Sequence, residues 1–275
     1  MSDKIGIIIP CRNVSSTICA LFDSLSSKLL SRIDRILCID NQSRDNTVST
    51  LLELQSRKNT PYSGKVAIIK NHEDYNYGGS IKIGFQYFIR SNYDWIIILH
   101  SDGQIDANSI LSTLFEATQG IPAPQVILTS RFLQESDTSK YSRARIIGNL
   151  VFNSLTAFTT GLKMSDSGAA ISMLRVSLLK DLPFFQITNG LHFHPQLNIL
   201  IYSDPNIVVS EVPILWRDSD LPSSVRIIKY SLQLIKMLIG YKFNQRIGRS
   251  GAALFPFRDE NFHPEFDSLP PDHKQ

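Results

Sequence analysis

Short apolar runs alternate with segments of helical periodicity along the first hundred residues of the chain. Four of these runs are almost entirely aliphatic and predict buried strands, at 4–9, 35–39, 66–69 and 96–99. Apolar residues recur every three or four positions in the segments that follow the first three runs, which predicts helices. Strands that alternate with helices of this length favour an α/β fold with a parallel sheet and right-handed crossovers.

The fourth predicted strand ends abruptly in polar residues that can bind a metal ion. In open α/β sheets, ligands bind beyond the carboxyl ends of the strands, so we expect His100, Asp102 and Gln104 to lie beside a substrate. Alternate spacing lets the three side chains point the same way in extended backbone, and one cation could then bridge them to a diphosphate. The alternative is a polar turn after a core strand, formed by Asp102-Gly103 and capped by His100.

The polar loops that follow these strands carry a set of motifs in a fixed order. They are Ile8-Ile9-Pro10-x-x-Asn13, Ile39-Asp40-Asn41-x-Ser43-x-Asp45, Asn76-x-Gly78-Gly79-x-x-x-x-Gly84 and Leu99-His100-Ser101-Asp102-Gly103-Gln104, followed by Ser130-Arg131, Asp166-Ser167-Gly168 and Glu211-Val212-Pro213. This ordered set resembles family 2 glycosyltransferases of the GT-A fold. Within that family, it is most similar to the branch of dolichol- and polyprenyl-phosphate sugar synthases.

The resemblance implies a Rossmann-like domain whose central sheet is mostly parallel and flanked by helices. We expect this GT-A domain to span residues 1–248 and to end in an amphipathic helix. Residues 249–275 show no periodicity, so they form a tail that is either flexible or strapped over the domain.

The resemblance also assigns roles at the nucleotide. Pro10 and Asn13 fall where the family's first loop lines the nucleotide pocket, and Asp40 falls on the acidic residue that binds the base. An aspartate suits this task because it accepts a hydrogen bond from a ring N–H and can discriminate between bases. The alternative for Asp40 is a carboxylate that caps the next helix.

A glycine pair and a lysine follow the third strand. Gly78 and Gly79 would let the backbone approach the nucleotide or its diphosphate, and Lys82 could offer a positive charge. A Gly-Gly pair alone is equally typical of an ordinary turn.

The metal motif departs from the family pattern at one position. The usual Asp-x-Asp reads His100-Ser101-Asp102 here, while Gln104 stays where the polyprenyl-phosphate branch also has a glutamine. Imidazole is a poor ligand for Mg²⁺ but acceptable to Mn²⁺, so of the two cofactor metals we favour Mn²⁺. The cation would neutralise charge on the departing nucleoside diphosphate. Alternatively, His100 hydrogen-bonds a phosphate, and Asp102 and Gln104 hold the ion.

The second half of the chain holds the candidates for the acceptor side. Arg131 suits phosphate recognition, although a solvated arginine is the ordinary alternative, and Asp166 lies in the loop that the resemblance assigns to the acceptor. Many family members carry a Glu-Asp pair where this chain reads Leu191-His192-Phe193-His194. His194 is the nearest replacement for the missing catalytic aspartate, with a structural histidine as the alternative. An acceptor that is already a phosphate anion needs no general base.

Composition agrees with one globular enzyme domain. The chain has 275 residues, 43% of them hydrophobic, which is enough for a single core, and its net charge of +3 gives no argument for a nucleic-acid partner. The three cysteines lack metal-ligand spacing and cannot all pair, and no signal peptide precedes Ile5. We therefore expect a cytoplasmic protein, with a peripheral place on the inner face of the membrane if it meets a lipid.

No apolar window is long enough to cross a bilayer, yet Ser223 to Tyr241 is a candidate for peripheral membrane contact. Ile228, Leu232, Ile235 and Leu238/Ile239 predict one apolar helix face, and Arg226, Lys229 and Lys236 lie on another. The alternative is a helix that packs this stripe into the core.

Together these features predict a metal-dependent glycosyltransferase that moves a sugar from a nucleotide-diphosphate sugar to an acceptor, with inversion implied by the resemblance. Polyprenyl phosphate is the leading acceptor, and a saccharide of envelope or capsule assembly is its rival. Two other classes stay open: a sugar-nucleotide-binding pseudoenzyme without metal-dependent turnover and, more distantly, a nucleotidyltransferase.

Overall fold

The computed structural model describes residues 3–217, 227–259 and 262–267. Its strands are β1 (Ile5–Cys11), β2 (Arg35–Asp40), β3 (Val66–Asn71), β4 (Trp95–Ile98), β5 (Val126–Ser130), β6 (Ser172–Arg175), β7 (Val209–Pro213) and β8 (Phe266–Asp267). Its helices are α1 (Ile18–Ser24), α2 (Ser27–Leu30), α3 (Thr47–Ser56), α4 (Asn76–Arg90), α5 (Ala107–Ala117), α6 (Arg143–Thr160), α7 (Val176–Asp181), α8 (Phe193–Ser203) and α9 (Ile227–Arg246), followed by a short 3₁₀ turn at Gly251–Leu254.

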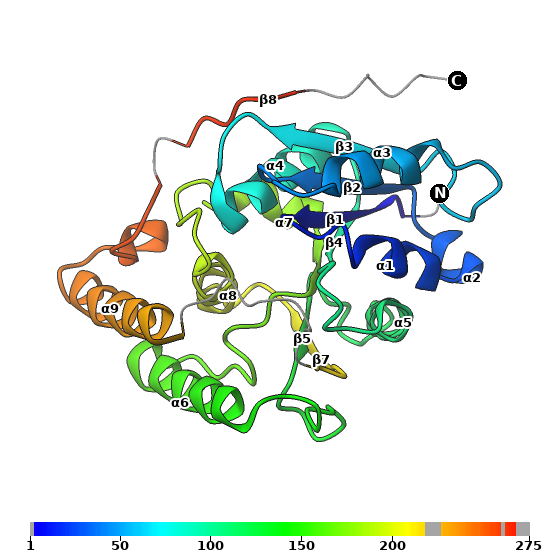
Figure 1. The fold of residues 1–275 in the computed structure, drawn as a ribbon. Coiled ribbons are helices and arrows are strands. Elements are labelled where there is room, and N and C mark those ends of the chain that lie inside the picture. The colour runs from blue at the N-terminus through cyan, green and yellow to red at the C-terminus, as the bar shows by residue number, and fades with distance from the viewer. Residues whose placement is uncertain (1–2, 218–226, 260–261, 268–275) are drawn as a thin grey trace.

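The strands form one twisted sheet in the order β7-β5-β6-β4-β1-β2-β3-β8 (Figure 1). Strands β1 to β4 are mutually parallel where they pair, as the alternation of strands and helices predicts. Strand β6 runs antiparallel between β4 and β5, and β7 is parallel to β5. The expected mostly parallel GT-A sheet flanked by helices is confirmed.

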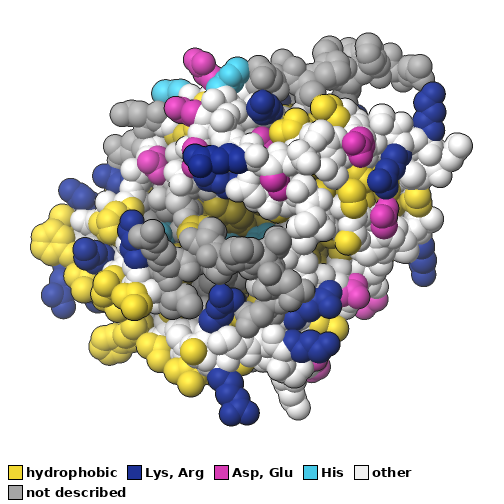
Figure 2. Space-filling model, viewed as in Figure 1, with side chains coloured by type: hydrophobic (Ala, Val, Ile, Leu, Met, Phe, Trp, Pro, Cys, Tyr) yellow, Lys and Arg dark blue, Asp and Glu magenta, His cyan; other side chains and the backbone are white. Residues whose placement is uncertain are grey.

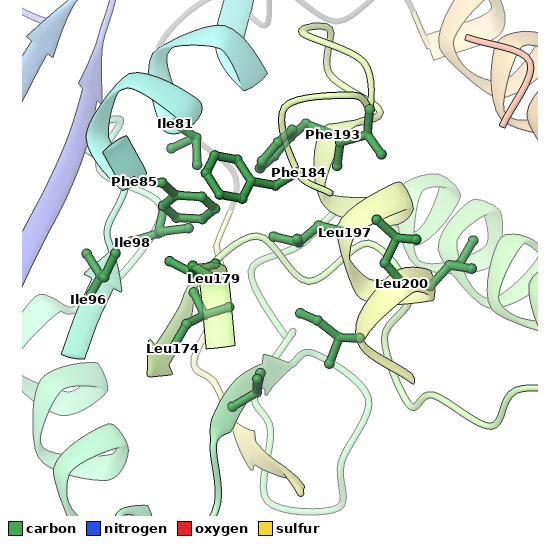
Figure 3. Packing of buried hydrophobic residues seen from close by; sticks show 14 of the residues in the cluster. Ile81, Phe85, Ile96, Ile98, Leu174, Leu179, Phe184, Phe193, Leu197 and Leu200 are labelled. Carbon is green, nitrogen blue, oxygen red and sulfur yellow. The ribbon is translucent and has the colours of Figure 1, made fainter. Parts of the chain in front are cut away.

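Both faces of the sheet are buried, because successive side chains of each strand enter opposite cores. On β1, Ile8 joins the core formed with α4, α7, α8 and α9, whereas Ile7 and Ile9 join the core formed with α1, α3 and α5. Figure 3 shows the first of these cores, in which Phe85 and Phe193 meet from α4 and α8. This double burial explains why the central strands are continuous aliphatic runs.

A glycine in β1 lets α4 lie close to the sheet. A Cβ atom at Gly6 would come within 2.2 Å of the Phe88 ring, so only glycine leaves room for that aromatic side chain. The last turns of α4 therefore pack directly against the beginning of β1.

The end of the described chain returns to the sheet. Helix α9 begins at Ile227, so residues 223–226 of the predicted amphipathic segment lie outside the described residues. Its expected apolar face is split, because Leu238 is buried whereas Ile228, Leu232 and Ile239 are exposed. Strand β8 then pairs antiparallel with the outer edge of β3 (Figure 1). None of the helices in the described ranges is long and apolar enough to span a bilayer.

Candidate functional site

The carboxyl ends of the parallel strands bring the predicted nucleotide residues to one edge of the sheet. Asp40 is the last residue of β2 and is fully buried. Its Oδ2 accepts a long hydrogen bond of 3.4 Å from the backbone N–H of Ser43, and its Oδ1 has no hydrogen-bond partner in the described part of the chain. Because buried polar atoms are nearly always paired, this oxygen is equipped to accept a hydrogen bond from a ligand.

A polar network fixes the loops on either side of Asp40. The Asn41 amide donates to Asp74 at 2.8 Å, and its oxygen accepts from the backbone N–H of Tyr75 at 3.0 Å. Arg12 forms an ion pair with Asp74 at 2.6 Å. Burial alone would raise the pKa of Asp74, but hydrogen bonds from the Asn76 backbone, Arg12 and Asn41 lower it below its usual value. The carboxylate therefore stays charged and ties the loop after β1 to the loop after β3.

The loop after β1 is held directly against the loop after β2. Asn13 has a left-handed backbone (φ 54°), and its side-chain oxygen accepts from the N–H of Arg44 at 2.8 Å. Its own N–H donates to Ser43 Oγ at 2.9 Å. The carbonyl of Pro10 accepts a hydrogen bond from Ser101 Oγ at 3.5 Å. Because β1 lies between β4 and β2, Pro10 and Asn13 lie between the end of β4 and Asp40 at the end of β2.

Gly78, Gly79 and Lys82 bind a neighbouring loop of the protein. The N–H groups of both glycines donate to the carbonyl of Asn189, at 2.7 and 3.3 Å. The buried Lys82 ammonium donates to the carbonyls of Phe185 and Ile187 and to the side chain of Asn189. These bonds use all three ammonium protons, and burial lowers the pKa of Lys82 to about 8. The contacts give the three residues a structural function, and a function toward the donor stays a prediction.

The end of β4 forms the expected turn. Asp102 Oδ1 accepts from the backbone N–H of Gln104 at 3.2 Å across Gly103, whose φ is 77°. His100 lies two residues before Asp102 and is only partly buried. Among the described residues, no three His, Cys, Asp or Glu side chains are grouped to hold an ion. A metal site formed by His100, Asp102 and Gln104 therefore stays a prediction.

A tyrosine links His100 to His194. The Tyr77 hydroxyl lies 2.9 Å from His100 Nε2 and 2.8 Å from His194 Nε2. One hydroxyl proton cannot serve both rings, so one imidazole accepts from Tyr77 and the other donates to it. Burial raises the pKa of Tyr77 well above its usual value, which keeps this proton in place. The orientation and tautomer of the two histidines are therefore coupled.

His194 is a weak base in this setting. It lies in the first turn of α8, is buried, and its Nδ1 has no hydrogen-bond partner. Burial, followed by the proximity of His100, lowers the pKa of His194 to about 3. This low basicity favours the structural alternative for His194 over proton abstraction at neutral pH.

Arg131 and Asp166 bind each other. The Arg131 guanidinium donates two hydrogen bonds of 2.7 Å to the two carboxylate oxygens, and the backbone N–H groups of Arg131 and Gly168 add two more at 3.2 Å. Burial alone would lower the pKa of Arg131, but the facing Asp166 charge raises it. The guanidinium also lies 5.5 Å from the Trp216 ring and 5.8 Å from the Tyr141 ring. The pair links the end of β5 to the loop before β6.

Comparison with known proteins identifies the family. Residues 6–183 match the family model described as glycosyl transferase family 2. The chain belongs to this family. It is accordingly a glycosyltransferase that uses a nucleotide-sugar donor. No curated protein sequence matches the chain significantly.

Solved structures confirm the fold of this glycosyltransferase. Three are complexes of glucosyl-3-phosphoglycerate synthase from Mycobacterium tuberculosis: with Mn²⁺, UDP and glucosyl-3-phosphoglycerate, with Mn²⁺, UDP-glucose and phosphoglyceric acid, and with Mn²⁺, UDP-glucose and glycerol 3-phosphate. Each is 15% identical, and the match covers 90% of this chain and 81% of the other. The TM-scores are 0.61, 0.61 and 0.60. At this identity, the likeness shows a shared GT-A architecture.

Several residues near the carboxyl edge of the sheet were not predicted from the sequence. Tyr77 joins the two histidines, Trp216 packs on Arg131, and the Tyr230 ring stacks on His192 at 4.6 Å. The position of Tyr77 beside Gly78-Gly79 was the only available signal for it. Nothing in the sequence pattern connects Trp216 or Tyr230 with this edge.

A cavity of about 460 Å³ adjoins the same edge at Asp74. Its lining consists of the loop after β3 together with residues near the end of the chain: Glu73, Asp74, Tyr75, Asn76, Asn189, Arg258, Asp259, Phe262 and His263. None of the predicted site residues lines it. We therefore place the candidate site at the strand ends, where Asp40, His100 and Asp102 lie.

Proposed function

We propose that this glycosyltransferase moves a sugar, with inversion, from a nucleoside-diphosphate sugar to polyprenyl phosphate. The observation that carries donor binding is the buried and unpartnered Asp40 Oδ1 at the carboxyl end of β2. A carboxylate oxygen in this position accepts a hydrogen bond from a ring N–H, which uracil, thymine and guanine present. The neighbouring network through Asn41 and Asp74 holds the backbone on both sides of the base.

We assign the diphosphate to the end of β4. Asp102 would hold a divalent cation together with phosphate oxygens of the donor, and His100 and Gln104 lie close enough in sequence to assist. When bound, the metal neutralises charge on the leaving nucleoside diphosphate. An imidazole beside the carboxylate favours Mn²⁺ over Mg²⁺. The Mn²⁺ and UDP in the complexes of the mycobacterial synthase support this assignment.

The weak basicity of His194 favours an acceptor that is already an anion. A hydroxyl acceptor needs a base to remove its proton, whereas a phosphate oxygen attacks without one. With a pKa of about 3, His194 binds a proton too weakly to serve a hydroxyl well. For this reason we propose a lipid phosphate rather than an envelope or capsule saccharide as the acceptor. The acceptor would meet the enzyme at the cytoplasmic face of a membrane, where the segment from Ser223 to Tyr241 is the expected contact.

On the acceptor side, we propose that Arg131 and Asp166 act as one unit. Asp166 holds the guanidinium in a fixed plane, and Arg131 Nη1 donates to the Tyr141 hydroxyl at 3.4 Å. The carboxylate offsets the guanidinium charge, so the pair has no net charge beside His100 and Trp216. The remaining N–H of Arg131 Nη1 would orient an anionic acceptor by hydrogen bonding, without transferring a proton.

A transfer assay tests the proposal. The protein is incubated with Mn²⁺, polyprenyl phosphate and labelled UDP-, GDP- or TDP-sugars, and organic and aqueous phases are analysed separately. We expect label in the organic phase, equimolar nucleoside diphosphate, and inverted anomeric configuration by proton NMR. An oligosaccharide product in the aqueous phase would indicate that the acceptor is a saccharide and not the lipid. Donor binding without any turnover would establish the pseudoenzyme instead, and pyrophosphate release from a nucleoside triphosphate would establish a nucleotidyltransferase.

A further inference from the structure

Helices α6 and α9 pack side by side and expose an unusual number of large apolar side chains. Ten of the fifteen exposed large hydrophobic residues in the described part of the chain lie on these two helices. They are Ile147, Leu150, Val151, Leu155 and Phe158 on α6, and Ile228, Leu232, Ile235, Ile239 and Phe243 on α9. Phe158 is 89% exposed and Ile228 is 78% exposed. Apolar side chains concentrated in this way mark an interaction surface.

We call this surface the α6–α9 face. Its exposed apolar residues recur at helical spacing along both helices. On α9, each exposed apolar residue follows the previous one by three or four positions, while Leu234, Met237 and Tyr241 point into the core. Figure 2 shows hydrophobic side chains gathered at the lower left of the molecule, where Figure 1 places α6 and α9. The helices thus use one side for the protein core and keep a second apolar side on the surface.

The α6–α9 face is also strongly cationic. The two helices contain six Lys and Arg residues and no Asp or Glu: Arg143, Arg145, Lys229, Lys236, Lys242 and Arg246. The whole chain has a net charge of only +3, so the rest of the molecule is net negative. In Figure 2, blue side chains surround the yellow ones in this region. Lys229, Lys236 and Lys242 each neighbour an exposed apolar residue in sequence, an arrangement that suits an interface between headgroups and acyl chains.

We propose that the α6–α9 face binds the surface of an anionic lipid bilayer, with its apolar side chains among the acyl chains and its cations on lipid phosphates. Charge complementarity favours this occupant over a second copy of the chain. A two-fold pairing through the same face would bring the five exposed cations of each copy together, with no carboxylate on either helix to offset them. These cations are Arg143, Lys229, Lys236, Lys242 and Arg246. An anionic bilayer attracts the same charges.

Both helices reach from this face to the candidate site. On α6, Asn153 accepts from the N–H of Ser167 at 2.9 Å and donates to the carbonyl of Ser165, so it holds the loop that carries Asp166. On α9, Tyr230 stacks on His192 at 4.6 Å. A bilayer on the α6–α9 face would therefore lie against the acceptor side of the site. The inference that this face binds a membrane is independent of the proposed function. The further inference that the membrane delivers a lipid acceptor rests on that function.

Vesicle sedimentation tests the inference without donor or acceptor. Wild-type protein is mixed with vesicles of equal parts phosphatidylcholine and phosphatidylglycerol, or of phosphatidylcholine alone. We expect binding to the anionic vesicles that weakens with salt. Replacing Lys229, Lys236 and Lys242 by glutamine should weaken binding by about a hundredfold, at ~fivefold per lysine. Replacing Lys28, Lys58 and Lys180, which are exposed on other elements, is the matched control and should leave it unchanged.

A second pair of variants tests the apolar contribution. Phe158→Ser combined with Ile239→Ser should reduce vesicle binding, whereas Leu52→Ser combined with Ile121→Ser, two exposed sites elsewhere, should not. Failure of the wild type to bind anionic vesicles, or equal loss in test and control variants, would overturn the proposal. So would a dimer in sedimentation velocity that the Phe158→Ser/Ile239→Ser pair dissociates, because the occupant would then be a second copy. Calorimetry with nucleotides reports on the proposed function separately.

Discussion

Replacing Asp166 by asparagine is expected to destabilise the folded protein by about 3 kcal/mol. The side chains of Asp166 and Arg131 are only 2% and 12% exposed, so water cannot solvate the guanidinium once its counter-charge is gone. The carboxylate accepts four hydrogen bonds. Asparagine keeps one acceptor oxygen, and its NH₂ group faces two of the four donors. Breaking a buried pair costs about 3–5 kcal/mol, and the retained oxygen places this isosteric change at the lower end.

Urea unfolding measures this loss. Trp216, whose ring lies 5.5 Å from the Arg131 guanidinium, gives a fluorescence signal near the pair. At a slope of ~3 kcal/mol/M, the midpoint should fall by about 1 M with the slope unchanged. The control is Asp23→Asn, which removes a surface pair with Arg57 whose members are 62% and 39% exposed. That change should cost less than ~1 kcal/mol. If Asp166→Asn proves as mild as Asp23→Asn, the buried clamp does not stabilise the fold as argued.

Three further outcomes are expected. The folded state disfavours protonated His194, whose pKa is about 3, so it should lose about 2 kcal/mol of stability as the pH drops from above the ordinary value of ~6.5 to near pH 5. Urea midpoints measured above and below that value should fall less in His194→Gln than in the wild type. The fall that remains comes from His100 and His192, because burial also lowers the pKa of both. An equal fall in both proteins would disprove the assignment. Lys82→Met should lower stability by ~3 kcal/mol, because one buried and two half-buried acceptors lose their donor, while nucleotide affinity changes little. Thermal unfolding and calorimetry separate these effects, and a loss of affinity at full stability would indicate that Lys82 binds the diphosphate. Asp102→Asn should reduce metal-dependent turnover by roughly a hundredfold or more, and a variant with wild-type rates would exclude Asp102 as a metal ligand.

The central sheet could be predicted from the sequence because its strands are buried on both faces. The runs that became β1 to β4 have few polar interruptions, and the helices after them supply the crossovers of a parallel sheet. Strand β6 was not predicted, since Ser172–Arg175 is four residues long and half polar. The two residues of β8 likewise depend on an edge that only the folded β3 provides.

The candidate site could be predicted where it follows strand ends, and not where it depends on distant partners. Asp40 comes directly after one aliphatic run, and Asp102 follows the end of another within three residues, so their place at the carboxyl edge follows from the pattern. Arg131 and Asp166 were both expected at the acceptor side, but their mutual pairing across 35 residues was not. Lys82 looked like a ligand for phosphate until the fold surrounded its ammonium with carbonyls from residues more than 100 positions away. Long-range hydrogen bonds of this kind leave no periodic trace in the sequence.

Isothermal calorimetry with UDP-, GDP- and TDP-sugars in the presence of Mn²⁺ tests the central claim most directly, because it reports on the unpartnered Asp40 oxygen itself. The account predicts that one nucleotide-sugar binds the wild type, that Asp40→Ala weakens this binding by at least ~tenfold, and that Glu53→Gln, an exposed carboxylate on α3, leaves it unchanged. Equal affinity of Asp40→Ala and wild type for that donor would contradict the account, because the base would then bind elsewhere.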